Sequence, residues 1–181
     1  MAANAARVMY YKKEVYSLWL MPTGRTRDDL QRLIVDLSKK HSTPRFEPHV
    51  TLIGEIQSPV SELKSKTEKL ATLIEPLEIK LREVAYLNQF FRCMFIKAEK
   101  TKALMNARSI ACTELAQDND KNYMPHLSLM YGDLALSTKL GVIQEIGKEL
   151  AVDFGITDFH LYYTGGQPIE WHPVLRVRLG C

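Results

Sequence analysis

The sequence has few cysteines, and their spacing matches no common cysteine-based fold. Cys93, Cys112 and Cys181 are odd in number and lie far apart along the 181 residues. They form neither a C-x-x-C metal clip nor the dense disulfide framework of small secreted domains. We therefore expect reduced thiols in a protein of the cytoplasm.

Long apolar runs and linkers are also absent. No stretch approaches the roughly 20 apolar residues that cross a bilayer. The first 13 residues, MAANAARVMYYKK, contain no apolar segment of signal-peptide length. No tract rich in Gly, Ser or Pro divides the chain. We expect a flexible tail over residues 1–13, one folded domain over residues 14–181, and no membrane partner.

An excess of charge of one sign is missing as well. The 24 Lys and Arg residues nearly balance the 21 Asp and Glu residues, which leaves a net charge of +3. A protein that grips duplex DNA carries a stronger basic stripe, so we expect no DNA partner. The weak positive charge suits a small ligand that carries phosphate.

The apolar residues that are present follow mixed helical and strand patterns. Helices are predicted over about residues 26–40, 58–75, 101–115 and 137–150, and strands over 15–21, 49–56, 77–87, 91–99, 126–132, 151–164 and 173–180. Strand and helix pairs recur in both halves of the chain. This order predicts a single α+β domain built from two similar lobes.

One short motif occurs twice. The stretch 48-PHVTLIG-54 is nearly repeated as 125-PHLSLMYG-132. Side chains on a strand alternate between faces, so His49 and Thr51 point the same way, as do His126 and Ser128. If the lobes are related by a pseudo-twofold axis, the two imidazoles face each other across one solvent-filled cleft.

Two opposed imidazoles suit in-line displacement at phosphorus. A neutral histidine removes a proton from the attacking oxygen, while a protonated histidine donates one to the leaving oxygen. An ordinary histidine pKa of about 6.5 lets both forms coexist near neutral pH. The hydroxyls of Thr51 and Ser128 can donate to the phosphate oxygens, where charge builds up. This chemistry needs no metal or other cofactor.

Two other interpretations of the histidines are open. A single His-x-Thr on a strand is usually a packed or exposed residue without a catalytic role, but two matching copies are harder to explain in this way. A metal site requires a third protein ligand, and neither H-E-x-x-H nor a Cys-rich partner is present. We therefore prefer the acid–base interpretation.

The paired motifs resemble those of the 2H phosphoesterase superfamily, and especially the cyclic phosphodiesterases of plants and fungi. The resemblance extends in order from about residue 15 to 179. It includes the stretches 15-VYSLWLMP-22, 44-PRFEPHVTL-52, 90-FFRCMF-95, 123-YMPHLSLMY-131 and 170-EW-171.

The resemblance implies a bilobal fold with two pseudo-symmetric lobes, each with an antiparallel sheet flanked by helices, around the active-site cleft. It also implies metal-independent hydrolysis of 2′,3′-cyclic nucleotides to 2′-phosphates, or of ADP-ribose 1″,2″-cyclic phosphate to the 1″-phosphate. The implied catalytic residues are His49 and His126, the phosphate ligands Thr51, Ser128 and Tyr131, and the base-binding residues Phe91 (or Phe90) and Trp171. Tyr131 could equally be a core residue.

Two rival functions stay open at this point. One is a phosphodiesterase of the same superfamily that acts on RNA ends or 2′,5′-linked oligoadenylate, and the other is a non-catalytic nucleotide- or RNA-binding module. We expect a monomer whose partner is a small cyclic phosphate nucleotide, with RNA ends as a further class. Because Tyr131 follows only the second motif, we predict that His126 is the base and His49 the acid.

Overall fold

The computed structural model describes residues 14–180, so the predicted tail (1–13) lies outside it. All eight strands form one antiparallel sheet in the order β6-β3-β4-β5-β2-β1-β7-β8. The strands are β1 (Tyr16–Leu20), β2 (Val50–Ile56), β3 (Leu77–Tyr86), β4 (Met94–Ala98), β5 (His126–Met130), β6 (Glu149–Ile156), β7 (Asp158–Tyr163) and β8 (His172–Arg178). The helices are α1 (Gly24–His41), α2 (Val60–Thr72), α3 (Lys102–Glu114) and α4 (Leu136–Ile146), with 3-10 turns η1 (Phe90–Arg92) and η2 (Pro168–Glu170).

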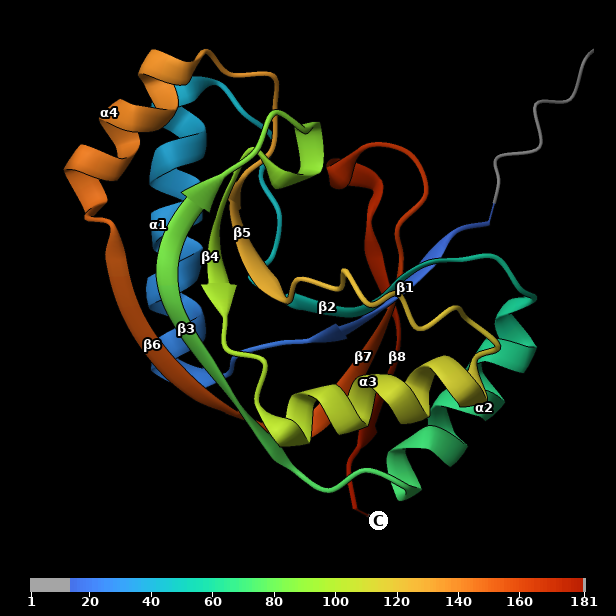
Figure 1. Cartoon of the computed structure of the whole chain (residues 1–181). Helices are drawn as coiled ribbons and strands as arrows, with labels where there is room; N and C mark the ends of the chain where they lie inside the picture. Colours follow the sequence, from blue (N-terminus) through green and yellow to red (C-terminus); the bar gives the residue numbers. More distant parts are fainter. Residues whose placement is uncertain (1–13, 181) are drawn as a thin grey trace, which may run out of the picture.

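The sheet consists of two four-stranded halves that meet at β2 and β5. These two strands pair only through Val50 and Leu127. With so short a junction the sheet is free to bend, and it curls strongly on itself (Figure 1). The predicted bilobal α+β fold is therefore confirmed, and the two expected sheets are the two halves of one continuous sheet.

The chain passes through the two halves in an interleaved order. The segment from β3 to β6 forms one half, while β1 and β2 combine with β7 and β8 from the end of the chain to form the other. Helix α1 packs on β5 and α4 on β3, whereas α2 packs on β7 and β8, and α3 packs on β2 and β3 (Figure 1). Each half of the sheet is thus covered by helices on its outer side.

The alternation predicted for the motif strands is observed. Val50, Leu52, Leu127 and Leu129 are completely buried in the core. Each such side chain contributes about 1.5–3 kcal/mol relative to exposure. Their burial fixes the register of β2 and β5, because a slip by one residue would turn every side chain to the opposite face.

Some element boundaries were predicted wrongly. The single strand expected over residues 151–164 is two strands, β6 and β7, because the chain crosses at Thr157 from the edge beside β3 to the place beside β1. The fourth helix ends at Ile146 rather than near residue 150. Gly147 adopts a φ of 90°, which a glycine reaches without strain, and its N–H closes the last turn on the Ile143 carbonyl at 2.9 Å.

Candidate active site

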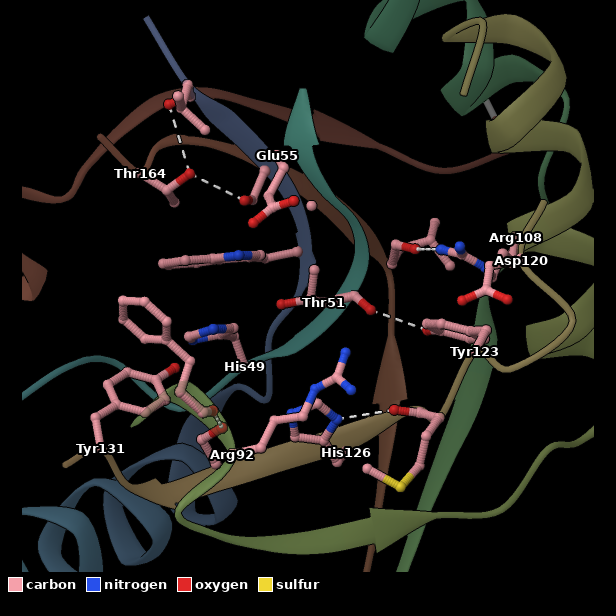
Figure 2. A pocket seen from close by; sticks show the side chains of 18 of the residues that line it. His49, Thr51, Glu55, Arg92, Arg108, Asp120, Tyr123, His126, Tyr131 and Thr164 are labelled. Carbon is pink, nitrogen blue, oxygen red and sulfur yellow. Dashed lines mark hydrogen bonds between the residues drawn. The ribbon is translucent and has the colours of Figure 1, made fainter. Parts of the chain in front are cut away.

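A cavity of about 530 Å³ is lined by residues of both halves of the sheet. All seven residues predicted for the site line it: Phe91, His49, Thr51, His126, Ser128, Tyr131 and Trp171. In Figure 2, His126 projects into this cavity from β5, and His49 projects into it from the position directly before β2; these are the two strands of the junction. The junction therefore brings together two motifs that lie 77 residues apart in the numbering of the chain.

Both histidines are held in the same way by the backbone before them. The Nδ1 atom of His49 lies 2.6 Å from the Glu47 carbonyl oxygen, and Nδ1 of His126 lies 2.8 Å from that of Met124. A carbonyl oxygen only accepts, so each Nδ1 carries the proton and donates it. In the neutral ring Nε2 is then the unprotonated nitrogen, ready to accept a proton.

His49 is more enclosed than the sequence suggested. We expected it to face a solvent-filled cleft, yet it is only 5% exposed. The Trp19 ring stacks on it with centroids 3.6 Å apart and planes 9° apart, and Tyr162 stacks on the other side of Trp19 at 4.1 Å. Burial lowers the pKa of His49 to about 4, although the hydrogen bond to Glu47 acts in the opposite direction.

The pKa of His126 is also lowered, chiefly by burial, and the nearby charge of Arg92 lowers it further. Its hydrogen bond to Met124 raises the pKa and partly offsets these effects. Both imidazoles are therefore neutral in the free protein at pH 7. The protonated form that a general acid needs has to be stabilised by a negatively charged ligand in the cavity.

The buried His49 predicts a pH dependence of stability. The folded state resists protonation down to about pH 4, while the unfolded chain takes up a proton near pH 6.5. The contribution of His49 to stability is thus complete above about pH 6.5 and is lost as pH falls, by about 3 kcal/mol at pH 4. We expect the free energy of unfolding in urea to decline less over this window in His49→Gln than in the original chain; parallel curves would contradict the lowered pKa.

The hydroxyls surround the space between the histidines. The Ser128 hydroxyl donates to the Phe91 carbonyl at 3.3 Å and is also hydrogen-bonded to Tyr131. The Thr51 side chain lines the cavity, and its carbonyl accepts a hydrogen bond of 2.9 Å from the Tyr123 hydroxyl. These contacts fix the backbone and side chains that present donors to a ligand.

Tyr131 is both a core residue and a cavity residue. It is buried, and its ring stacks on Phe46 with centroids 3.9 Å apart. It still lines the cavity, and burial raises the pKa of its phenol. The hydroxyl therefore stays protonated at neutral pH and can donate a hydrogen bond.

An aromatic cluster closes one end of the cavity. Phe91 is 50% exposed and lies 5.9 Å from Trp171 between ring centroids, while Phe90 does not line the cavity. The indole Nε1 of Trp171 is buried, and no residue between 14 and 180 accepts a hydrogen bond from it. An exposed ring beside an unsatisfied donor suits an aromatic ligand with polar edges.

This cluster predicts how replacement of Trp171 affects kinetics. We expect Trp171→Ala to raise KM by the equivalent of about 1–3 kcal/mol with little change in kcat, because a stacked base is held equally in the ground and transition states. Trp171→Phe keeps a ring but removes the N–H, so it separates stacking from hydrogen bonding. Unchanged KM values for several nucleotides would place Trp171 outside the base site.

Sequence analysis missed several residues of the cavity. Trp19, Arg92, Arg108 and Tyr123 line it. Trp19 carried a usable signal, because it alternates with the buried Leu18 and Leu20 and must face the opposite side of β1. Arg108 carried none: it reaches from α3 to the Leu52 carbonyl and lies 3.9 Å above the Tyr123 ring.

The metal interpretation requires a cluster of ligands around the histidines. Over residues 14–180, no three His, Cys, Asp or Glu side chains gather closely enough to hold an ion. The lining around His49 and His126 consists mainly of hydroxyls and aromatic rings, with Arg92 and Arg108 as cations and Glu55 and Asp120 as separate carboxylates.

Comparison with known proteins places this arrangement in a family. Residues 15–174 match the family model described as cyclic phosphodiesterase-like protein. The cyclic phosphodiesterase of Arabidopsis thaliana is 29% identical over 128 residues, which are 71% of each chain. The 2′,3′-cyclic-nucleotide 3′-phosphodiesterase of Phaeosphaeria nodorum is 31% identical over 134 residues, 65% of this chain and 68% of the relative.

Solved structures share the fold. The protein TT0787 of Thermus thermophilus has a TM-score of 0.66 at 14% identity, covering 92% of this chain and 98% of that one. LigT of E. coli, solved with 3′-AMP, has a TM-score of 0.59 at 14% identity with the same coverage. The family match confirms the resemblance to the 2H phosphoesterases and the expectation of an enzyme. The chain belongs to the family of cyclic phosphodiesterase-like proteins.

Proposed function

We propose that this protein hydrolyses 2′,3′-cyclic nucleotides to nucleoside 2′-phosphates by acid–base catalysis between His49 and His126. The observation that carries the proposal is the shared cavity, in which both imidazoles have their Nδ1 atoms bound to backbone carbonyls. Both Nε2 atoms are thereby free for proton transfer. The names of the Arabidopsis and Phaeosphaeria relatives support the same class of reaction.

The proposed reaction uses only side chains of this chain. The base accepts a proton from water at Nε2 while the water oxygen attacks phosphorus in line with the leaving 3′ oxygen. The bond from phosphorus to the 3′ oxygen breaks, and the acid supplies that oxygen with a proton. The hydroxyls of Thr51, Ser128 and Tyr131 donate to the non-bridging oxygens, where negative charge increases in the transition state.

Binding of the substrate is what allows one histidine to be protonated and act as the acid. Burial keeps both imidazoles neutral in the free protein, and the anionic phosphate stabilises the imidazolium that forms beside it. In the proposed complex the pKa of the acid is therefore raised from its value in the free protein. The limb of the pH profile that reports the acid should lie at higher pH for kcat than for kcat/KM.

ADP-ribose 1″,2″-cyclic phosphate is a second candidate substrate in this proposal. The aromatic cluster around Phe91 and Trp171 would hold its adenine as it would hold a nucleotide base. We further propose that the protein acts in the cytoplasm on small molecules as a monomer. Over residues 14–180 no helix is both apolar and long enough to cross a membrane, and Cys93 and Cys112 are free thiols.

A turnover assay with product identification tests the proposal. We expect the fastest hydrolysis with 2′,3′-cyclic AMP or ADP-ribose cyclic phosphate, and full activity after exhaustive chelation, because the side chains supply acid, base and charge stabilisation. Faster cleavage of 2′,5′-linked oligoadenylate would favour the rival that acts on RNA ends. Binding without turnover of any of them would favour the non-catalytic module, and activity restored only by added metal would require a different mechanism.

A further inference from the structure

Arg92 is an exposed cation in the lining of the cavity, and it has no part in the acid–base mechanism. Its side chain extends from η1 across His126 toward the space beside Thr51 (Figure 2). Within residues 14–180 its guanidinium has no carboxylate partner and no hydrogen-bond acceptor. A guanidinium presents donors in a planar fork that matches two oxygens of a phosphate group.

Arginines on a protein surface commonly point into water without a specific role. The backbone that carries Arg92, however, is anchored. The Arg92 carbonyl accepts from the Leu87 N–H at 3.0 Å, the Phe90 carbonyl from the Gly132 N–H at 2.9 Å, and the Phe91 carbonyl from Ser128. Two of these three bonds tie η1 to β5 and to Gly132, two residues after it, so the backbone that carries Arg92 is held beside the strand of His126.

The cavity also needs a positive charge that its hydroxyls do not supply. Thr51, Ser128 and Tyr131 are neutral donors, and both imidazoles are neutral before a ligand binds. A cyclic phosphate is an anion, and its phosphoryl oxygens gain charge as water attacks. A fixed cation directed at these oxygens stabilises the transition state more than the ground state.

We propose that Arg92 is a catalytic residue that binds the non-bridging phosphate oxygens and neutralises the charge developing on them. This inference rests on the proposed function, since it assumes that a phosphate occupies the space between His49 and His126. In this proposal, η1 supplies the cation of the phosphate site, while the two motifs at β2 and β5 supply the acid, the base and the hydroxyls.

The charge of Arg92 also acts on His126. Lys97 lies opposite His126 in the β4–β5 register and is paired with Glu83 at 2.9 Å. The other charged residues of the cavity lining are Glu55, Arg108 and Asp120. His49 faces His126 across the cavity. Among these groups, Arg92 is the one whose charge lowers the pKa of His126. Removing this charge should therefore raise the pKa of His126 in the free protein.

Three variants test the proposal on 2′,3′-cyclic AMP. We expect Arg92→Gln to lower kcat about 10²-fold, and Arg92→Lys to stay within about tenfold of the original chain because it keeps the charge but loses the fork. Arg25→Gln is the control, since Arg25 has a side chain 95% exposed on α1 and does not line the cavity. The His126 limb of kcat/KM should move to higher pH in Arg92→Gln and stay in place in the other two.

A binding measurement separates this inference from the proposed function. Inorganic phosphate is titrated into each variant while the imidazole resonances of His126 are followed by NMR. We expect the phosphate affinity to fall at least about tenfold in Arg92→Gln and to remain unchanged in Arg25→Gln. If the original chain hydrolyses no cyclic phosphate but this difference appears, the proposed function fails and the phosphate role of Arg92 stands. If Arg92→Gln matches the original chain in phosphate affinity and in kcat, or if the original chain binds no phosphate, the inference is overturned.

Discussion

Replacing His49 or His126 with Ala is expected to lower turnover of a 2′,3′-cyclic nucleotide by about 10²–10⁴-fold, the range for loss of a positioned acid or base. The two losses should not add in the double variant, because one proton transfer without the other leaves the displacement incomplete. Steady-state rates on 2′,3′-cyclic AMP, measured for the single and double variants, check both statements.

The structure determines which controls this experiment needs. His49 is buried against Trp19, so His49→Ala leaves a void and removes packing as well as chemistry. His49→Gln fills more of the space and should be as inactive as His49→Ala while unfolding at a higher temperature. His172→Ala removes an exposed histidine outside the cavity and should retain full activity. A folded His49 or His126 variant with near-normal rates on every cyclic phosphate would refute the acid–base mechanism.

A substrate whose leaving group needs no proton should distinguish the acid from the base by about 10²-fold or more. On a p-nitrophenyl phosphodiester, we expect His49→Ala to recover most of its lost rate, because protonation of the leaving oxygen is no longer required. His126→Ala should stay impaired, because water still has to be activated. The measurement is the ratio of the two substrates' rates for each variant.

The lowered pKa values of His49 and His126 bear on which of the two is the acid. With a pKa of about 4 in the free protein, His49 is the harder of the two residues to protonate, which opposes its assignment as the acid until phosphate is bound. The Tyr131 phenol beside Ser128 supports a phosphate or water site on the side of His126. Recovery of His126→Ala instead of His49→Ala would reverse the assignment and make His49 the base.

The sequence predicted best those features of the site that depend only on residues close together in the chain. Alternation within each motif predicted that His49 and Thr51 share one face while Val50 and Leu52 enter the core, and the structure places them so. The paired motif, together with the supporting stretches along the chain, was also enough to indicate the family. These features depend on a few consecutive residues and on the period of a strand.

The environment of the site could not be predicted in the same way. His49 is buried against Trp19 and also contacts Trp171, which lies more than 100 residues later in the chain. Its pKa therefore depends on tertiary packing rather than on the motif. The 3-10 turn that carries Arg92 lies where the sequence predicts the beginning of a strand, because 91-FRCMFIKAE-99 is apolar enough for one.

The interleaved order of the strands has a consequence for how the chain is made. During synthesis β1 and β2 emerge early, yet β1 keeps one edge open until β7 appears, as the register of Tyr16 with Tyr163 requires. The segment from β3 to β6, in contrast, finds α1 already available to cover β5. This half can therefore form first on the ribosome, while β2, the strand directly after His49, is still paired with a β1 whose other edge is open. Nascent chains stalled before β7 should expose a strand edge open to aggregation and to chaperones.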